Sequence, residues 1–89
     1  MPNQIPSNTR IAVIGQGYVG LPLAVEFGKF YPTVGFDIHQ TRIKQLQQGV
    51  DLTKEMTAEQ LSSAVHLKFS AELNEIQDCN LYIVTVPTP

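Results

Sequence analysis

Three glycines at a fixed spacing are the residues most informative about chemistry in this chain. Gly15, Gly17 and Gly20 stand in Gly-Gln-Gly-Tyr-Val-Gly, a G-x-G-x-x-G pattern. The first permits a tight turn, the second lets backbone approach a pyrophosphate, and the third lets a helix pack closely on a strand. Free amides at the helix start attract phosphate. The pattern predicts dinucleotide binding, with the amides of Tyr18 and Val19 among the donors; a tight turn without a ligand is the alternative.

A carboxylate follows the glycine pattern at the end of the second apolar segment. This residue is Asp37. A carboxylate at that place accepts hydrogen bonds from the adenosine ribose and repels a 2′-phosphate, which favours NAD over NADP. Asp37 is also placed to cap the next helix, and both roles can coexist. Arg42, on the first turn of that helix, either lies against the adenosine end and weakens the bias against NADP, or is solvated.

A threonine hydroxyl follows the last apolar segment of the sequence. Thr88 stands between two prolines, which fix the direction of its backbone. Its hydroxyl is placed to contact the cofactor near the diphosphate or the nicotinamide ribose, and a plain exit turn is the alternative.

The remaining reactive side chains do not form a catalytic set. Cys79 precedes the last apolar segment, and its neighbours supply no cation that would lower its pKa, so we expect it to be inert. His39 and His66 are isolated in sequence, and we expect both at the surface. The sequence therefore predicts no catalytic residue and no metal site in this chain.

The elements that position these residues alternate along the chain. Strands are predicted at 10–14, 33–37, 67–70 and 81–86, and helices at 21–30, 40–48 and 57–65, with one more helical turn within 71–79 and a flexible lead-in at 1–9. With right-handed crossovers, this order gives an α/β fold with a parallel sheet of order 3-2-1-4 and flanking helices. That is a partial Rossmann fold, the N-terminal half of a doubly wound sheet. The glycine turn and Thr88 should then meet across one crevice, at the switch point of the sheet.

Two of the predicted elements carry finer detail. Thr57 and Gln60 fit the capping-box pattern at the start of the third helix, whose residues Leu61, Ala64 and Val65 should face inward. The segment 81–86 is apolar on both faces, as in a central parallel strand.

Composition limits the classes of partner. The 89 residues are 43% hydrophobic and 16% charged, which is typical of one small globular domain. Six basic against eight acidic residues give a net charge of −2 without a basic cluster, which argues against nucleic acid. The apolar runs fall far short of the ~20 residues of a membrane span, and the polar N-terminus is not a signal peptide. One cysteine excludes an internal disulfide. We expect a cytoplasmic protein with no nucleic-acid or membrane partner.

Three segments resemble the UDP-glucose/GDP-mannose dehydrogenase family at its N-terminal NAD-binding domain. They are IAVIGQGYVGLPLA at 11–24, GFD at 35–37 with Arg42 beyond it, and YIVTVPTP at 82–89. GYVGLPLA together with VPTP is far more specific than the glycines alone. VEFGKF, GVDLTKEMTAEQL and LKFS are most similar to UDP-N-acetylhexosamine 6-dehydrogenases, including the bacterial Vi-antigen and O-antigen enzymes that act on UDP-N-acetylglucosamine or UDP-N-acetylgalactosamine.

The resemblance implies that residues 10–89 are the opening portion of a longer enzyme's Rossmann domain. Such an enzyme oxidises the C6 alcohol of the sugar to a carboxylate with two NAD⁺, through a thiohemiacetal and a thioester on a cysteine. The family's cofactor positions carry over to Val19 with its glycine turn, Asp37, Arg42 and Thr88. Its catalytic residues and UDP-sugar site correspond to segments beyond residue 89, so we expect this chain to be inactive by itself.

Two other classes stay open from the sequence. One is a free-standing module that binds a dinucleotide without chemistry. The other is a self-associating module, because a bare apolar edge at 81–86 invites pairing with a second copy.

Overall fold

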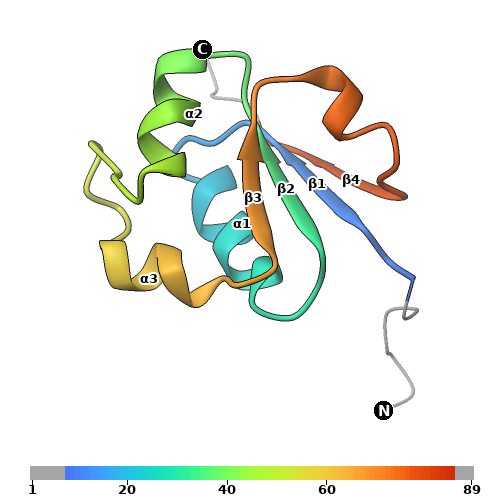
Figure 1. Cartoon of the computed structure of the whole chain (residues 1–89), viewed down its shortest axis with the longest axis horizontal. Helices are drawn as coiled ribbons and strands as arrows, with labels where there is room; N and C mark the ends of the chain where they lie inside the picture. The colour runs from blue at the N-terminus through green and yellow to red at the C-terminus, as the bar shows by residue number, and fades with distance from the viewer. Residues whose placement is uncertain (1–7, 86–89) are drawn as a thin grey trace.

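The computed structural model describes residues 8–85, and the predicted elements are all present (Figure 1). Their order is β1 (Ile11–Ile14), α1 (Gly20–Gly28), β2 (Thr33–Phe36), α2 (Gln40–Gln47), α3 (Ala58–Ser63), β3 (Leu67–Ser70), the 3-10 turn η1 (Leu73–Glu75) and β4 (Leu81–Val84). Thr88 lies outside the described residues, as do residues 1–7 of the predicted lead-in. The described end of that lead-in lies against the sheet: Thr9 is buried, and Asn80 Nδ2 donates to the Asn8 carbonyl over 3.1 Å.

The four strands form one parallel sheet in the order β3-β2-β1-β4, which confirms the predicted topology. The pairing is in step from the first residue of each strand: Ile11 is opposite both Thr33 and Leu81, and Thr33 is opposite Leu67. The carboxyl ends of all four strands therefore lie at the same end of the sheet. In sheets of this class, ligands bind at the carboxyl ends of the strands.

Helices cover the two faces of the sheet unequally (Figure 1). Ile11 and Val13 of β1 pack with Ala24 of α1 on the face that carries the three helices. Ala12 points to the other face, where it packs with Ile76 beside η1. A second group joins α1, α2 and α3 and contains Leu21, Val25, Leu46, Leu61 and Ala64. Helix α1 thus packs directly on β1, and α2 and α3 pack against α1 on the same face of the sheet.

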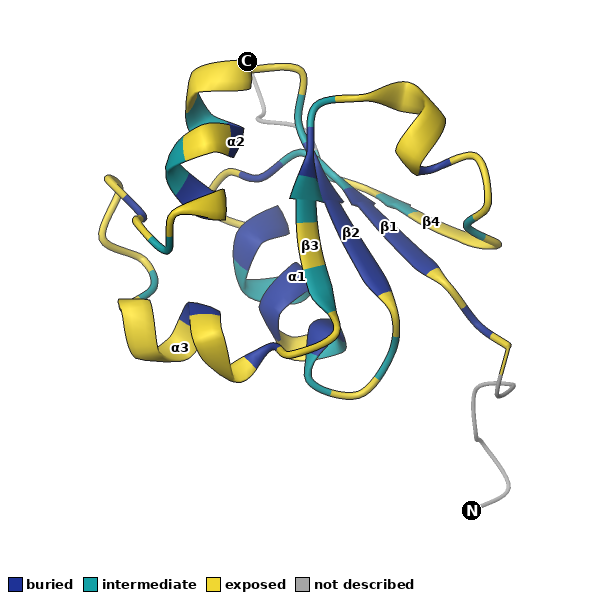
Figure 2. Ribbon diagram, viewed as in Figure 1, coloured by how far each residue is buried: buried dark blue, intermediate teal, exposed yellow. Residues whose placement is uncertain are grey.

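Burial separates the central strands from the edge strands (Figure 2). Residues of β2 are all buried, whereas Leu81, Tyr82 and Val84 of β4 are 38%, 46% and 65% exposed. The segment was expected to be covered like a central strand, but among residues 8–85 it pairs with β1 alone. Its exposed side chains match the bare apolar edge that the self-association alternative requires.

The third helix begins as predicted and ends earlier. The Gln60 amide donates to Thr57 Oγ1 over 3.1 Å, and the Thr57 amide donates to Gln60 Oε1 over 2.8 Å, so the capping box is confirmed. Leu61 and Ala64 are buried, but Val65 is 74% exposed and its predicted inward position is wrong. The reason is local: the helix ends at Ser63, and Ala64 leaves the helical region with ψ of 76°.

Truncation of Leu21 tests the packing between the helices. Leu21 has no exposed surface, so Leu21→Ala should lower the free energy of unfolding by about 2–5 kcal/mol. Val65→Ala removes apolar atoms at an exposed site and should change it by less than about 0.5 kcal/mol. Urea unfolding followed by circular dichroism measures both. Equal effects of the two substitutions would contradict this assignment of the core.

Candidate functional site

The glycine turn links β1 to α1 under tight steric control. Gly15 has φ of +97°, a conformation that L side chains rarely adopt, and its amide donates to the Phe36 carbonyl over 2.7 Å. A Cβ on Gly15 would lie 1.8 Å from the Thr85 carbonyl oxygen, and one on Gly20 would lie 1.6 Å from the Gly15 carbonyl oxygen. Glycine is required at both positions because the backbones already touch.

The middle of the turn is open, in contrast to its two ends. A Cβ on Gly17 would meet nothing within 4 Å, and the side chains of Tyr18 and Val19 are 71% and 63% exposed. Among residues 8–85, no hydrogen bond uses the amides of Gly17, Tyr18, Val19 or Gly20. Four consecutive free amides at a helix start, with open space beside the second glycine, fit a diphosphate.

Asp37 is joined to this turn by a direct hydrogen bond. Its Oδ2 accepts from the Gln16 amide over 2.9 Å, and its Oδ1 accepts from the His39 amide over 3.0 Å and lies 2.7 Å from His39 Nδ1. The N-cap of α2 is His39, so the simple capping alternative for Asp37 is wrong. His39 is exposed as predicted, but it is not isolated, because its ring lies against the Asp37 carboxylate.

Asp37 remains ionised because these donors favour its charged form. Partial burial acts to raise the pKa of Asp37, but the hydrogen bonds from the Gln16 amide and from His39 outweigh it and hold the pKa below its usual value. A carboxylate has about four acceptor positions on its two oxygens. Three donors therefore leave it able to accept from a ribose hydroxyl.

Arg42 holds the turn from the α2 side. Its Nε and Nη2 donate to the Gln16 carbonyl over 3.0 and 2.8 Å, and its Nη1 donates to Asp51 Oδ1 over 2.7 Å. Only 15% of the Arg42 side chain is exposed, so the solvated alternative is wrong. The backbone carbonyl of Gln16 thus accepts from Arg42, while its backbone amide donates to Asp37.

Asp51 is a site residue that the sequence analysis missed. Its side chain has no exposed surface. Besides Arg42, it accepts hydrogen bonds from the Thr53 amide and hydroxyl and from the amides of Glu55 and Met56. Burial acts to raise the pKa of Asp51, but these hydrogen bonds, chiefly from the side chains of Thr53 and Arg42, lower it to about 2. The available clue was an Asp two residues before a Thr in a loop, which is typical of a side chain that caps its own turn.

Gln16 occupies a variable position of the motif and was also missed. Its side chain is fully buried, and Nε2 donates to the carbonyls of Val13 and Gly15 over 2.8 and 3.0 Å. Its Oε1 has no partner within the described chain and lies where a Cβ on Gly35 would be 2.6 Å away. The side-chain amide of Gln16 therefore fixes the backbone at the end of β1 and fills the space beside Gly35 of β2.

Thr85 brings the end of β4 to the glycine turn. Its Oγ1 lies 3.0 Å from the Ile14 carbonyl and 2.9 Å from the Gly15 carbonyl, so one hydroxyl hydrogen serves two acceptors. The loops after β1 and β4 therefore meet, as the topology predicts. Sequence reasoning singled out Thr88 at this end, which the described residues do not include, and passed over Thr85.

The other reactive side chains take no part in this site. Burial and the adjacent Asp78 raise the pKa of Cys79, against weaker opposing effects of Arg10 and Lys68, as expected for an inert thiol. His66 is exposed. Across residues 8–85, no cluster of three or more His, Cys, Asp or Glu side chains could hold a metal ion.

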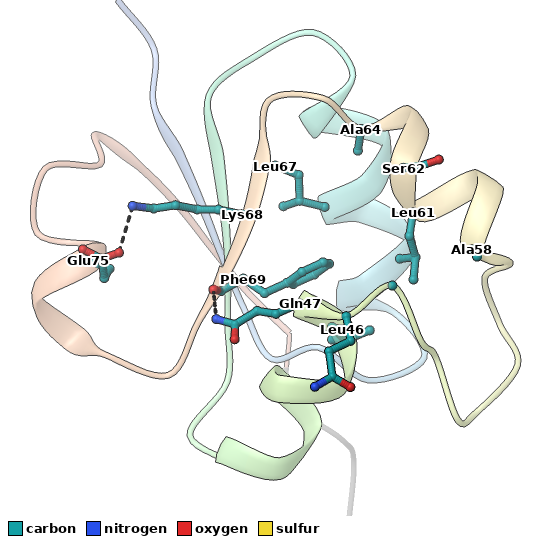
Figure 3. Close-up of a pocket in the computed structure, with 12 residues that line it drawn as sticks. Leu46, Gln47, Ala58, Leu61, Ser62, Ala64, Leu67, Lys68, Phe69 and Glu75 are labelled. Atoms are coloured by element: carbon teal, nitrogen blue, oxygen red, sulfur yellow. Dashed lines mark hydrogen bonds and ion pairs between the residues drawn. The ribbon is translucent and has the colours of Figure 1, made fainter.

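A separate hollow of about 660 Å³ lies between α2, α3 and β3 (Figure 3). Leu46, Leu61 and Phe69 line it, whereas Lys68 turns away to an ion pair of 2.8 Å with Glu75. Within residues 8–85 these two are the charged residues that line it, and they bind each other. The hollow is a packing groove at the β3 edge, away from the glycine turn.

The fold and the turn together define a class. A parallel 3-2-1-4 sheet, a glycine turn with free amides and an acid at the end of β2 make the dinucleotide-binding half of a Rossmann domain. Residues 9–89 match the UDP-glucose/GDP-mannose dehydrogenase family, NAD binding domain. The chain belongs to this family, and its cofactor is NAD.

Relatives of known activity are much longer than this chain. It is 58% identical over 80 residues to UDP-N-acetyl-D-glucosamine 6-dehydrogenases of Salmonella typhi and Pseudomonas aeruginosa, covering 90% of this chain and 19% of each relative. The solved UDP-D-ManNAc dehydrogenase of Pyrococcus horikoshii superposes with a TM-score of 0.83 at 34% identity, over 91% of this chain and 21% of that one. The chain thus spans about a fifth of the length of these proteins.

None of the helices formed by residues 8–85 has the length and apolar character needed to cross a membrane.

The buried Asp51 carboxylate predicts a defined loss of stability in acid. Its pKa is about 2 in the folded chain against 3.8 ordinarily. Because the folded value is the lower one, Asp51 contributes fully above about pH 4, and this contribution of about 2 kcal/mol is lost as the pH falls through about 2. Asp51→Asn should therefore destabilise the chain at pH 6 and much less at pH 2, in urea unfolding at both values. A difference from wild type that does not change with pH would contradict this prediction.

Proposed function

We propose that NAD binds along the glycine turn, with its diphosphate on the amides of Gly17, Tyr18, Val19 and Gly20 and its adenosine ribose on Asp37. The observation that carries the proposal is the hydrogen bond of 2.9 Å between the Gln16 amide and Asp37. It places the one ionised carboxylate at the end of β2 directly beside the free amides. Arg42 flanks the adenosine end, and Thr88 is proposed to contact the cofactor from the loop after β4.

The residues of this chain would bind and orient the cofactor. Bound NAD⁺ supplies the acceptor for a hydride. Gly15 and Gly20 permit the close backbone contacts of the turn, which a Cβ at either position would prevent, and these contacts would direct the amides toward the diphosphate. Asp37, ionised at neutral pH, accepts from the ribose hydroxyls and repels a 2′-phosphate.

For the whole protein, we propose a UDP-N-acetylhexosamine 6-dehydrogenase. It would oxidise the C6 alcohol to the uronic acid with two NAD⁺, in the cytoplasm, for bacterial surface polysaccharide such as capsule or O-antigen. The support is the 58% identity to two UDP-N-acetyl-D-glucosamine 6-dehydrogenases. The UDP-sugar site and the catalytic residues are assigned to the part of such relatives that this chain does not match.

Two substitutions separate cofactor binding from folding. Gly17→Ala places a methyl group in open space, so the fold should be retained while the diphosphate loses its close approach. Asp37→Ala removes the ribose acceptor. Each should weaken NAD⁺ binding about tenfold or more in calorimetric titration. The exposed Asp78→Ala is the matched control and should bind like wild type.

The outcome also distinguishes the alternatives for this chain. Absence of NAD⁺ binding by a folded wild-type chain would contradict the proposed seat. It would favour a module that self-associates through the exposed side chains of β4. Circular dichroism of every variant establishes whether the fold is retained.

A turnover assay tests whether this chain alone has dehydrogenase activity. We expect no NADH from NAD⁺ and UDP-N-acetylglucosamine or UDP-N-acetylgalactosamine with the 89-residue chain, because its lone thiol has a raised pKa and lies outside the site. Absorbance at the wavelength of NADH measures this. Production of NADH by the chain alone would show that catalytic groups are present within it.

A further inference from the structure

We propose that Asp51 is a specificity-determining residue, which holds the Arg42 guanidinium and cancels its charge so that the site binds NAD and rejects the 2′-phosphate of NADP. This inference rests on the proposed seat of the adenosine ribose at Asp37. It concerns the charge beside that ribose, to which Asp51 contributes from the loop after α2, nine residues beyond Arg42.

Arg42 stands where a residue for the 2′-phosphate would be expected. Asp37 binds the amide of Gln16 and Arg42 binds the carbonyl of the same residue, so both side chains border the same part of the turn. In glycine-turn sites an acid on the ribose selects NAD, whereas an arginine nearby accommodates the 2′-phosphate of NADP. This chain carries both residue types together, and their effects oppose one another.

The geometry removes Arg42 from that competing role. Three of its five N–H groups are already used, two on the Gln16 carbonyl and one on Asp51 at 2.7 Å. Only 15% of its side chain is exposed. The guanidinium is therefore held in one orientation, with limited access for a phosphate oxygen.

Asp51 is itself fixed, so the pair acts as a unit. Its carboxylate has no exposed surface and accepts from Thr53, Glu55 and Met56 in addition to Arg42. The pair carries no net charge. A 2′-phosphate, with a charge of about −1.5 to −2 at neutral pH, would therefore face the negative Asp37 without a compensating cation from Arg42.

A purely structural role for Asp51 predicts a different result. The amides of Thr53, Glu55 and Met56 belong to the loop around Asp51 itself, so Asp51 would shape this loop even without Arg42. Loss of the loop's shape would weaken both cofactors together. Release of Arg42 would change their ratio.

The test is calorimetric titration of NAD⁺ and of NADP⁺ into wild type, Asp51→Asn, Arg42→Gln and the double variant. Asparagine keeps the shape of the side chain and one acceptor oxygen while removing the charge. Asp51→Asn should raise the affinity for NADP⁺ relative to NAD⁺ about tenfold, as one charge-assisted hydrogen bond to phosphate would. The double variant should return the ratio to the wild-type value, because the effect requires Arg42. Asp78→Asn removes an exposed charge and should leave the ratio unchanged.

Each result bears on one proposal. An unchanged ratio in Asp51→Asn, with NAD⁺ still bound, overturns the role of Asp51 and leaves the NAD seat intact. Failure of the wild-type chain to bind either dinucleotide overturns the seat itself, and the role of Asp51 with it. If Asp51→Asn does not fold, the double variant decides: because it removes both charges of the pair, the ratio of the NADP⁺ and NAD⁺ affinities should match that of wild type, and a selective loss of NADP⁺ binding overturns the inference.

Discussion

The contact between the backbones of Gly15 and Thr85 is the constraint on which the rest of the site depends. A Cβ on Gly15 would lie 1.8 Å from the Thr85 carbonyl oxygen, and the Thr85 hydroxyl is shared by the carbonyls of Ile14 and Gly15. This contact fixes the end of β4 against the exit from β1. Gly20 completes it, because α1 can start there only if no side chain separates it from Gly15. The free amides at the start of α1 owe their direction to this packing.

Gln16 links the glycine turn to the charged residues Asp37 and Arg42 through hydrogen bonds. The side chain of Gln16 donates to the carbonyls of Val13 and Gly15 at the end of β1. The backbone amide of Gln16 donates to Asp37, and its backbone carbonyl accepts from Arg42. The two hydrogen bonds that Nε2 donates offset part of the cost of burying this side chain, whose Oε1 has no partner within residues 8–85. The carboxylate of Asp37 and the guanidinium of Arg42 are thus both bound to the backbone of one residue, which sets their positions relative to each other.

Sequence reasoning succeeded where the determining interactions are local. The strand–turn–helix order around Gly15, the capping box at Thr57 and the parallel topology all follow from neighbouring residues and chain handedness. It missed Gln16 and Asp51, because their roles depend on which carbonyls and donors the folded backbone brings near them. Arg42 shows the same limit: its position was predicted, but its partners lie on two other segments.

The polar groups around the glycine turn differ in whether they already have hydrogen-bond partners within the protein, and this difference indicates what each would contribute to cofactor binding. Asp51 and Arg42 are engaged with the protein itself, and Asp37 has three internal donors with acceptor capacity left. The amides of Gly17 to Gly20 are different, because no group within residues 8–85 accepts from them. Affinity should therefore come chiefly from these amides, because a bound diphosphate offers several acceptor oxygens to neighbouring amides at a helix start. Selectivity should come from the preset charges at the ribose, because groups already fixed discriminate between ligands without having to reorganise.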